Sequence, residues 1–239
     1  MNTIAVTLTN ISKKYEIHHE KPTLVEKFIK GPNETFWALR DINVEARKGE
    51  RIGIIGPNGS GKTTLLKIIT GITKPTSGTV STSGNVISLI DLEAGFHEDL
   101  TGEQNIYLNG RILGLSKQTI DRQIDKIISF ADIKQFIDAP LFTYSKGMVL
   151  RLGFAIIIHT NPSILLLDEY FAVGDRDFQE KARRWLKQYI KKGNTIFLVS
   201  QTPSLIRKYC NRIILLHEGH IKYDGKISNL PLWTNEYFQ

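Results

Sequence analysis

Residues 56–63 carry the pattern that most constrains how this chain folds. They read Gly-Pro-Asn-Gly-Ser-Gly-Lys-Thr: a glycine, four residues, a second glycine, then Lys62 and Thr63. The apolar run Ile52–Ile55 precedes this pattern. The loop is therefore expected to join a strand to a helix that begins near Lys62 and ends near Gly71. Glycines let the backbone curl until several N–H groups point at one phosphate. The pattern predicts a nucleotide-binding loop. The alternative, a glycine-rich loop without a ligand, would not explain why Lys62 and Thr63 follow the last glycine.

Each part of this loop has its own chemistry toward a nucleotide. The N-terminus of the following helix presents the positive end of its dipole to an anion. Lys62 supplies a point charge to the outer phosphates, and the hydroxyl of Thr63 is suited to ligate Mg²⁺. The predicted nucleotide-binding residues here are Gly56, Pro57, Asn58, Gly59, Ser60, Gly61, Lys62, Thr63 and Thr64.

Two adjacent acids follow the apolar run Ile164–Leu167. Ligands of α/β sheets bind at the carboxyl ends of the strands. Asp168 is therefore expected to reach the Mg²⁺ shell beside the phosphate loop. Glu169 is the expected general base, which would polarise a water for attack on the γ-phosphate. Alone, such a pair could equally be two solvated acids at the end of a strand; the phosphate loop makes that interpretation the weaker one.

The remaining pattern alternates between strands and helices, which favours a largely parallel α/β sheet. Strands are expected at 4–9, 36–44, 52–55, 78–81, 85–90, 164–167, 195–199 and 212–216. The segment 91–160 is mainly helical in pattern and resembles an insertion into the sheet. A short amphipathic helix is expected at 23–30, between Pro22 and Gly31.

Composition indicates the compartment that the protein occupies and the charge of its partners. The 239 residues include one cysteine, Cys210, so no internal disulfide can form and a reducing compartment is expected. No run approaches the roughly 18 apolar residues of a membrane helix. The formal net charge of +7 suits an anionic partner without identifying it.

Further motifs resemble those of ATP-binding cassette (ABC) ATPases. The stretch Tyr144–Met148 reads Tyr-Ser-Lys-Gly-Met, similar to the Tyr-Ser-x-Gly-Met signature that polysaccharide exporters carry in place of Leu-Ser-Gly-Gly-Gln. Gly95–His97, Leu100–Gly110 and Ala172–Asp175 also resemble the exporters of O-antigen, capsule and teichoic acid. The resemblance covers nearly the whole chain.

The resemblance implies a fold and a set of partners. It implies one ABC ATPase domain over 1–239, with a mainly parallel nucleotide-binding core (1–90 and 161–239), an N-terminal antiparallel β subdomain and an inserted helical subdomain (91–160). It further implies a head-to-tail homodimer and a separate multi-helix permease. Such a protein would lie peripherally on the cytoplasmic face of the membrane, use ATP and Mg²⁺, and export a lipid-linked polysaccharide.

The resemblance also assigns roles to particular residues. Tyr15 would stack on adenine, with a surface tyrosine as the alternative. Ser145, Lys146 and Gly147 would approach the γ-phosphate bound by the opposite subunit. Asp175 would lie at the subunit boundary and link the two sites.

Three positions depart from the family pattern. Lys146 replaces a signature glycine, and Gln201 stands where the family usually has a histidine. Gln201 is the second expected catalytic residue: glutamine can hydrogen-bond the γ-phosphate but never carries a positive charge, so slow hydrolysis is expected. The usual glutamine of the loop before the helical subdomain is replaced by Asp91 or Glu93.

Four other functions are weaker interpretations. A soluble ABC ATPase acting on nucleic acid or ribosomes usually carries tandem cassettes or long coiled-coil insertions, and no nucleic-acid module is recognised here. An ABC ATPase for another cargo stays open. If the chain were a P-loop kinase or GTPase, Tyr144–Met148 would have no role. The Asn-Lys-x-Asp motif that recognises guanine does not occur in the sequence. Lys146 and Gln201 favour a scaffold that binds ATP and hardly hydrolyses it, whereas Glu169 argues against one.

Overall fold

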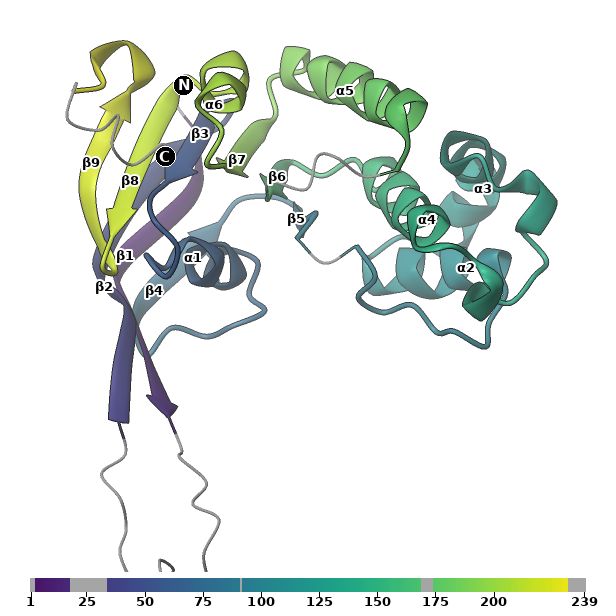
Figure 1. The fold of residues 1–239 in the computed structure, drawn as a ribbon, viewed down its shortest axis with the longest axis horizontal. Helices are drawn as coiled ribbons and strands as arrows, with labels where there is room; N and C mark the ends of the chain where they lie inside the picture. Colours follow the sequence, from purple (N-terminus) through teal and green to yellow (C-terminus); the bar gives the residue numbers. More distant parts are fainter. Residues whose placement is uncertain (1–2, 18–33, 91, 169–173, 232–239) are drawn as a thin grey trace, which may run out of the picture. The chain divides into compact units, whose positions relative to one another are not determined.

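The computed structural model describes residues 3–17, 34–90, 92–168 and 174–231 (Figure 1). The chain divides into two compact units: residues 1–47, 52–83 and 199–239 form the first, and residues 48–51 and 84–198 form the second. Within the described ranges, no helix combines the length and apolar character that crossing a bilayer requires. The helix expected at 23–30 lies outside the described residues.

The first unit contains an antiparallel three-stranded sheet. Its central strand β1 (Ile4–Ile17) pairs with β2 (Glu34–Arg47) on one side and β4 (Ser77–Thr82) on the other. Apolar side chains of β1, including Val6 and Leu8, are buried, as a strand with one face on a core requires. This sheet confirms the antiparallel N-terminal part of the expected fold.

The remaining strands and helices of the first unit hold the phosphate loop in position. Its elements are β3 (Arg51–Ile55), α1 (Lys62–Ile69), α6 (Pro203–Tyr209), β8 (Arg212–His217), β9 (His220–Lys226) and the 3₁₀ turn η4 (Ile227–Asn229). Strand β3 runs parallel to β8, and β9 returns antiparallel to β8. Ile52, Ile54 and Ile55 are fully buried, as expected for a strand covered on both faces. The strand–loop–helix order predicted around residues 56–63 is confirmed.

The second unit contains a parallel three-stranded group. Strand β6 (Ile164–Leu167) lies between β5 (Val86–Ser88) and β7 (Thr195–Val199). Every residue of β6 and of β7 is buried, and both strands have the predicted bounds. Helix α5 (Arg176–Lys191) separates them in the chain and buries Phe178, Ala182, Leu186 and Tyr189 on one face.

The second unit also contains the helical part of the chain. Its elements are α2 (Gly102–Ile112), α3 (Lys117–Ala131), α4 (Lys146–His159) and the short 3₁₀ turns η2 (Lys134–Phe136) and η3 (Leu141–Thr143) (Figure 1). These helices share a core of apolar residues. The core consists of Ile106, Ile120, Ile127, Ala131, Ile133, Leu141, Tyr144, Leu152, Ala155 and Ile156. This packing holds the start of α4, and with it Ser145, in place.

Candidate nucleotide-binding site

The phosphate loop curls because its glycines adopt backbone angles that other residues avoid. Gly61 has a φ of 104°, and a Cβ added there would collide with the carbonyl oxygen of Ala38. Gly59 has a φ of 79°, and a Cβ added there would meet nothing within 4 Å. The loop is therefore packed tightly at its base and open at Gly59.

The side chain of Lys62 folds back onto the backbone of the phosphate loop. Its Nζ donates to the carbonyl oxygens of Gly56 and Pro57, each at 2.8 Å. The residue is 8% exposed, so its ammonium group lies largely out of solvent beside these carbonyl oxygens. A buried cation in this position attracts an anion more strongly than an exposed lysine would.

The start of α1 is arranged to receive an anion. Gly61 is the N-cap residue and provides no side-chain cap, and the first turn of α1 contains no acidic residue. The hydroxyl oxygen of Ser60 is buried and has no hydrogen-bond partner within the described part of the chain. Thr63 is exposed in the first turn. Uncapped N–H groups, a buried hydroxyl without a partner and a nearby ammonium together fit a phosphate group.

Two other residues of the first unit were predicted to act on the nucleotide. Gln201 follows β7, and its Nε2 donates to Oδ1 of Asn58 in the phosphate loop at 2.8 Å. Tyr15 lies on β1 with 39% of its surface exposed, and Nζ of Lys13 lies 4.9 Å from the centre of its ring. The structure thus brings Gln201 onto the phosphate loop and leaves Tyr15 with an exposed ring.

The second unit holds the other predicted site residues. Asp168 follows the buried strand β6 and is half-buried. Glu169 and Asp91 lie outside the described residues. Glu93 is exposed in a turn, where its carbonyl oxygen accepts a hydrogen bond from the N–H of Phe96 at 3.1 Å.

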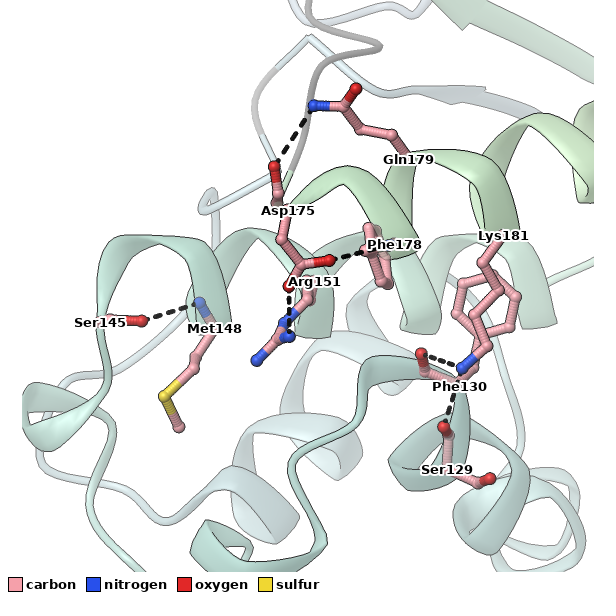
Figure 2. Close-up of polar contacts among 10 residues, drawn as sticks. Ser129, Phe130, Ser145, Met148, Arg151, Asp175, Phe178, Gln179 and Lys181 are labelled. Carbon is pink, nitrogen blue, oxygen red and sulfur yellow. Dashed lines mark hydrogen bonds and ion pairs between the residues drawn. The ribbon is translucent and has the colours of Figure 1, made fainter.

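The signature residues form the start of α4. The hydroxyl of Ser145 accepts a hydrogen bond from the N–H of Met148 at 3.3 Å and caps the helix (Figure 2). Lys146 is exposed at the first helical position. A Cβ added to Gly147 would meet only the Ser145 hydroxyl, at 3.9 Å. The packing of this chain therefore does not require glycine at 147.

Asp175 has two partners, and one of them was not predicted. Its Oδ1 accepts a hydrogen bond from the N–H of Phe178 at 2.9 Å and caps α5, while its Oδ2 pairs with Nη1 of Arg151 at 3.2 Å (Figure 2). The Phe178 hydrogen bond, with the Arg151 charge acting in the same direction, lowers the pKa of Asp175. Arg151 lies on α4, so this pair joins the signature helix to the start of α5.

Lys181 makes a second link between helices of this unit. From α5 its Nζ donates to the carbonyl oxygens of Ser129 and Phe130 at 3.2 and 3.0 Å, at the end of α3 (Figure 2). Helix α3 has no basic residue in its own last turn. The lysine thus satisfies carbonyl groups that a helix end leaves unpaired. Neither Arg151 nor Lys181 has a sequence signal of its own, because each partner lies on a different helix.

A buried strand, a glycine-rich turn holding a lysine, and an uncapped helix together define a phosphate-loop nucleotide-binding protein of the α/β class. The sequence model for the ABC transporter family matches residues 39–172. The chain therefore belongs to the ABC transporter family and is an ABC ATPase domain, a class that hydrolyses ATP.

Named relatives place the chain more closely within this family. It is 36% identical over 233 residues to the O-antigen export system ATP-binding protein RfbB of Klebsiella pneumoniae. The aligned region covers 94% of this chain and 95% of that protein. It is 40% identical over 237 residues to the teichoic acids export ATP-binding protein TagH of Bacillus anthracis, covering 98% of this chain. The chain spans 43% of the length of that second protein.

The fold matches that of a solved cassette. The dimeric structure of the ATP-binding cassette MJ0796, in a post-hydrolysis state bound to ADP and Pi, has a TM-score of 0.73 to this chain at 23% sequence identity. The match covers 94% of this chain and all of that one. This likeness confirms the α/β ABC ATPase fold that the sequence predicts.

Proposed function

We propose that this chain is the ATP-binding and ATP-hydrolysing subunit of a transporter that exports a lipid-linked polysaccharide across the cytoplasmic membrane. The observation that carries the proposal is the phosphate loop, in which Lys62 is held at the mouth of a curled, uncapped turn. The cargo is inferred from relatives whose names specify O-antigen and teichoic acid export.

In this proposal the loop binds the phosphates and the acids act on the metal and the water. Lys62 neutralises charge on the outer phosphates, and the Thr64 side chain lies on the same turn of α1. Thr63 and Asp168 are the residues predicted to hold Mg²⁺, which when bound would compensate the charge of the phosphate oxygens. Glu169 takes a proton from the attacking water. Tyr15 stacks on adenine with the ring face away from Lys13.

The signature residues act on the nucleotide of a second copy. A hydroxyl that accepts a capping hydrogen bond keeps its own O–H to donate, so Ser145 can bind a γ-phosphate without giving up the cap. The open space beside Gly147 is consistent with close approach of another molecule. We therefore expect a head-to-tail homodimer in which Ser145, Lys146 and Gly147 complete the site of the partner, and Asp175 lies at the boundary.

Two departures from the family pattern favour slow turnover. Lys146 adds a long side chain to the surface that approaches the partner nucleotide. Gln201 is neutral, so it stabilises the developing charge on the phosphate less than an imidazolium would. The chain would work beside a separate multi-helix permease, at the cytoplasmic face of the membrane.

The test combines purification and export in the organism that makes the chain. We expect the tagged full chain to purify from mild-detergent extracts with a multi-helix membrane protein. Deleting the chain should abolish the surface polysaccharide, and wild type but not Lys62→Ala should restore it. Lys67→Ala is the matched control, because Lys67 is an exposed lysine on the same helix. A complete polysaccharide in the deletion strain, with no membrane protein bound, would exclude the proposed cargo.

A further inference from the structure

A hydrogen bond between two amide side chains joins the phosphate loop to the segment after β7. Gln201 and Asn58 are 143 residues apart in the chain, yet Gln201 Nε2 donates to Asn58 Oδ1 at 2.8 Å. Both residues belong to the first unit. The distance is that of a well-formed N–H···O hydrogen bond.

The backbone on each side of this contact is held by other bonds. On the Gln201 side, Ser200 is fully buried, and its hydroxyl accepts a hydrogen bond from the N–H of Thr202 at 2.9 Å. On the Asn58 side, the carbonyl oxygen of Pro57 accepts from the N–H of Ser60 at 3.2 Å and from Lys62. The two segments are therefore anchored independently of the amide pair.

The contact restricts the direction of the Gln201 amide. An amide group carries two N–H donors on its nitrogen and an acceptor oxygen, all in one plane. The bond to Asn58 uses one of the two donors. Once that donor is held, the other N–H and the carbonyl oxygen can take fewer orientations relative to the phosphate loop.

Orientation matters more for glutamine here than it would for histidine. A charged imidazolium attracts a phosphate over a range of positions, whereas a neutral amide contributes only through a well-aligned hydrogen bond. A long glutamine side chain loses considerable rotamer freedom when it is ordered. A partner that orders it before the reaction removes that cost from the chemical step.

We propose that Asn58 is a positioning residue for Gln201: it orients the Gln201 amide toward the terminal phosphate of the bound nucleotide. The proposal rests on the proposed ATPase function and names a residue pair through which the site acts. The backbone of Asn58 stays part of the predicted phosphate loop, and its side chain then affects turnover through Gln201 rather than through nucleotide affinity.

The test is a double-mutant cycle on the full chain, with Asn58→Ala, Gln201→Ala and the double variant. The measured quantities are kcat and KM for ATP with Mg²⁺, and the Kd of ATP at equilibrium. We expect Asn58→Ala to lower kcat about tenfold and to change Kd less than about threefold, because a misplaced group costs rate more than ground-state binding. In the Gln201→Ala background the same change should have almost no effect.

Asn229→Ala is the matched control. Asn229 is also exposed in the first unit, and its Oδ1 also accepts a side-chain hydrogen bond, from Ser228 at 2.9 Å. This variant should leave kcat unchanged. Thermal unfolding of both asparagine variants should match wild type, since each side chain is exposed.

Several results would overturn the proposal. One is an unchanged kcat in Asn58→Ala; another is losses from Asn58→Ala and Gln201→Ala that multiply in the double variant. A Kd for ATP that rises in Asn58→Ala in proportion to the fall in kcat would show that Asn58 acts as an ordinary phosphate-loop residue. That result would also reject the proposal. Failure of the wild-type chain to bind ATP would instead refute the proposed function, so the two failures are distinguishable.

Discussion

Gly147 is a position whose predicted role in function is separate from the packing of its own chain. It lies in the first turn of α4, where any residue can adopt a helical backbone, and a Cβ there would meet only the Ser145 hydroxyl, at 3.9 Å. By contrast, a Cβ on Gly153 of the same helix would collide with the Leu92 carbonyl oxygen. Packing therefore explains Gly153 and gives no reason for glycine at 147.

We expect Gly147→Ala to separate stability from activity. Alanine is the better helix former by about 0.5–1 kcal/mol, so thermal stability should stay equal or rise. ATPase activity should fall, because the added methyl group occupies the face that approaches the partner nucleotide. Gln118→Ala, at the equivalent position of α3, is the control for both measurements. Lower stability with unchanged ATPase activity would contradict this explanation.

The neutral side chain of Gln201 makes a prediction about pH. Glutamine does not titrate, so Gln201 contributes no inflection to the rate profile of wild type. Gln201→His should raise kcat and add an inflection near the ordinary histidine pKa of about 6.5, with the gain largest below it, where the imidazole is charged. Measuring kcat from about pH 5.5 to 8.5 tests this expectation. Parallel profiles in the two proteins would mean that another step limits the rate.

At the scale of elements, side chains from one helix stabilise the end of another in the second unit. Asp175 caps α5 and pairs with Arg151 on α4, and Lys181 on α5 binds carbonyl groups at the end of α3 (Figure 2). The Nε of Arg151 is buried and lacks a hydrogen-bond partner among the described residues. The ion pair that links α4 to the start of α5 thus uses Nη1 of Arg151 and leaves Nε without a partner among the described residues.

We expect substitutions at Asp175 to lower the melting temperature in proportion to the number of Asp175 contacts that they remove. Asn caps helices about as well as Asp, so Asp175→Asn should lose only the ion pair and match Arg151→Met. Asp175→Ala also loses the cap and should have the lowest melting temperature. Because the folded-state pKa of Asp175 is lowered, its contribution is present above the unfolded pKa and lost as pH falls through the folded pKa. Wild type and Asp175→Asn should therefore converge in acid, and a constant difference at all pH values would contradict the assignment.

At the scale of the whole molecule, the proposed site requires two copies of the chain. The phosphate loop belongs to the first unit, and Ser145 and Gly147 belong to the second. The solved cassette with the same fold is itself a dimer. In the proposed homodimer, each complete active site would combine the phosphate loop of one copy with Ser145 and Gly147 of the other.

We expect Glu169→Gln to trap this dimer. The substitution removes the base that activates water and keeps a side chain of the same size, so nucleotide contacts should survive while turnover stops. Size-exclusion chromatography with light scattering should show dimers in ATP and monomers without it. Lys62→Ala should stay monomeric in ATP, because the loop loses its cation. Monomers of Glu169→Gln at saturating ATP would count against the two-copy site.

Sequence patterns located the elements whose signals are local. The buried strands β6 and β7 have the predicted bounds because each is a short apolar run between polar residues. Strand β9 was not predicted, because His220–Lys226 is largely polar and only half-buried. Its pairing with β8 is what makes it a strand.

The sequence by itself determined the phosphate loop, since its glycines, lysine and threonine are neighbours in the chain and their chemistry depends on local backbone geometry. Only the tertiary structure decided the pairs that act across distance, Asn58 with Gln201 and Arg151 with Asp175. The members of each pair lie on separate elements, and a hydrogen bond forms only when packing brings its two atoms within about 3 Å. No spacing in the sequence encodes that meeting, because it depends on how whole strands and helices pack.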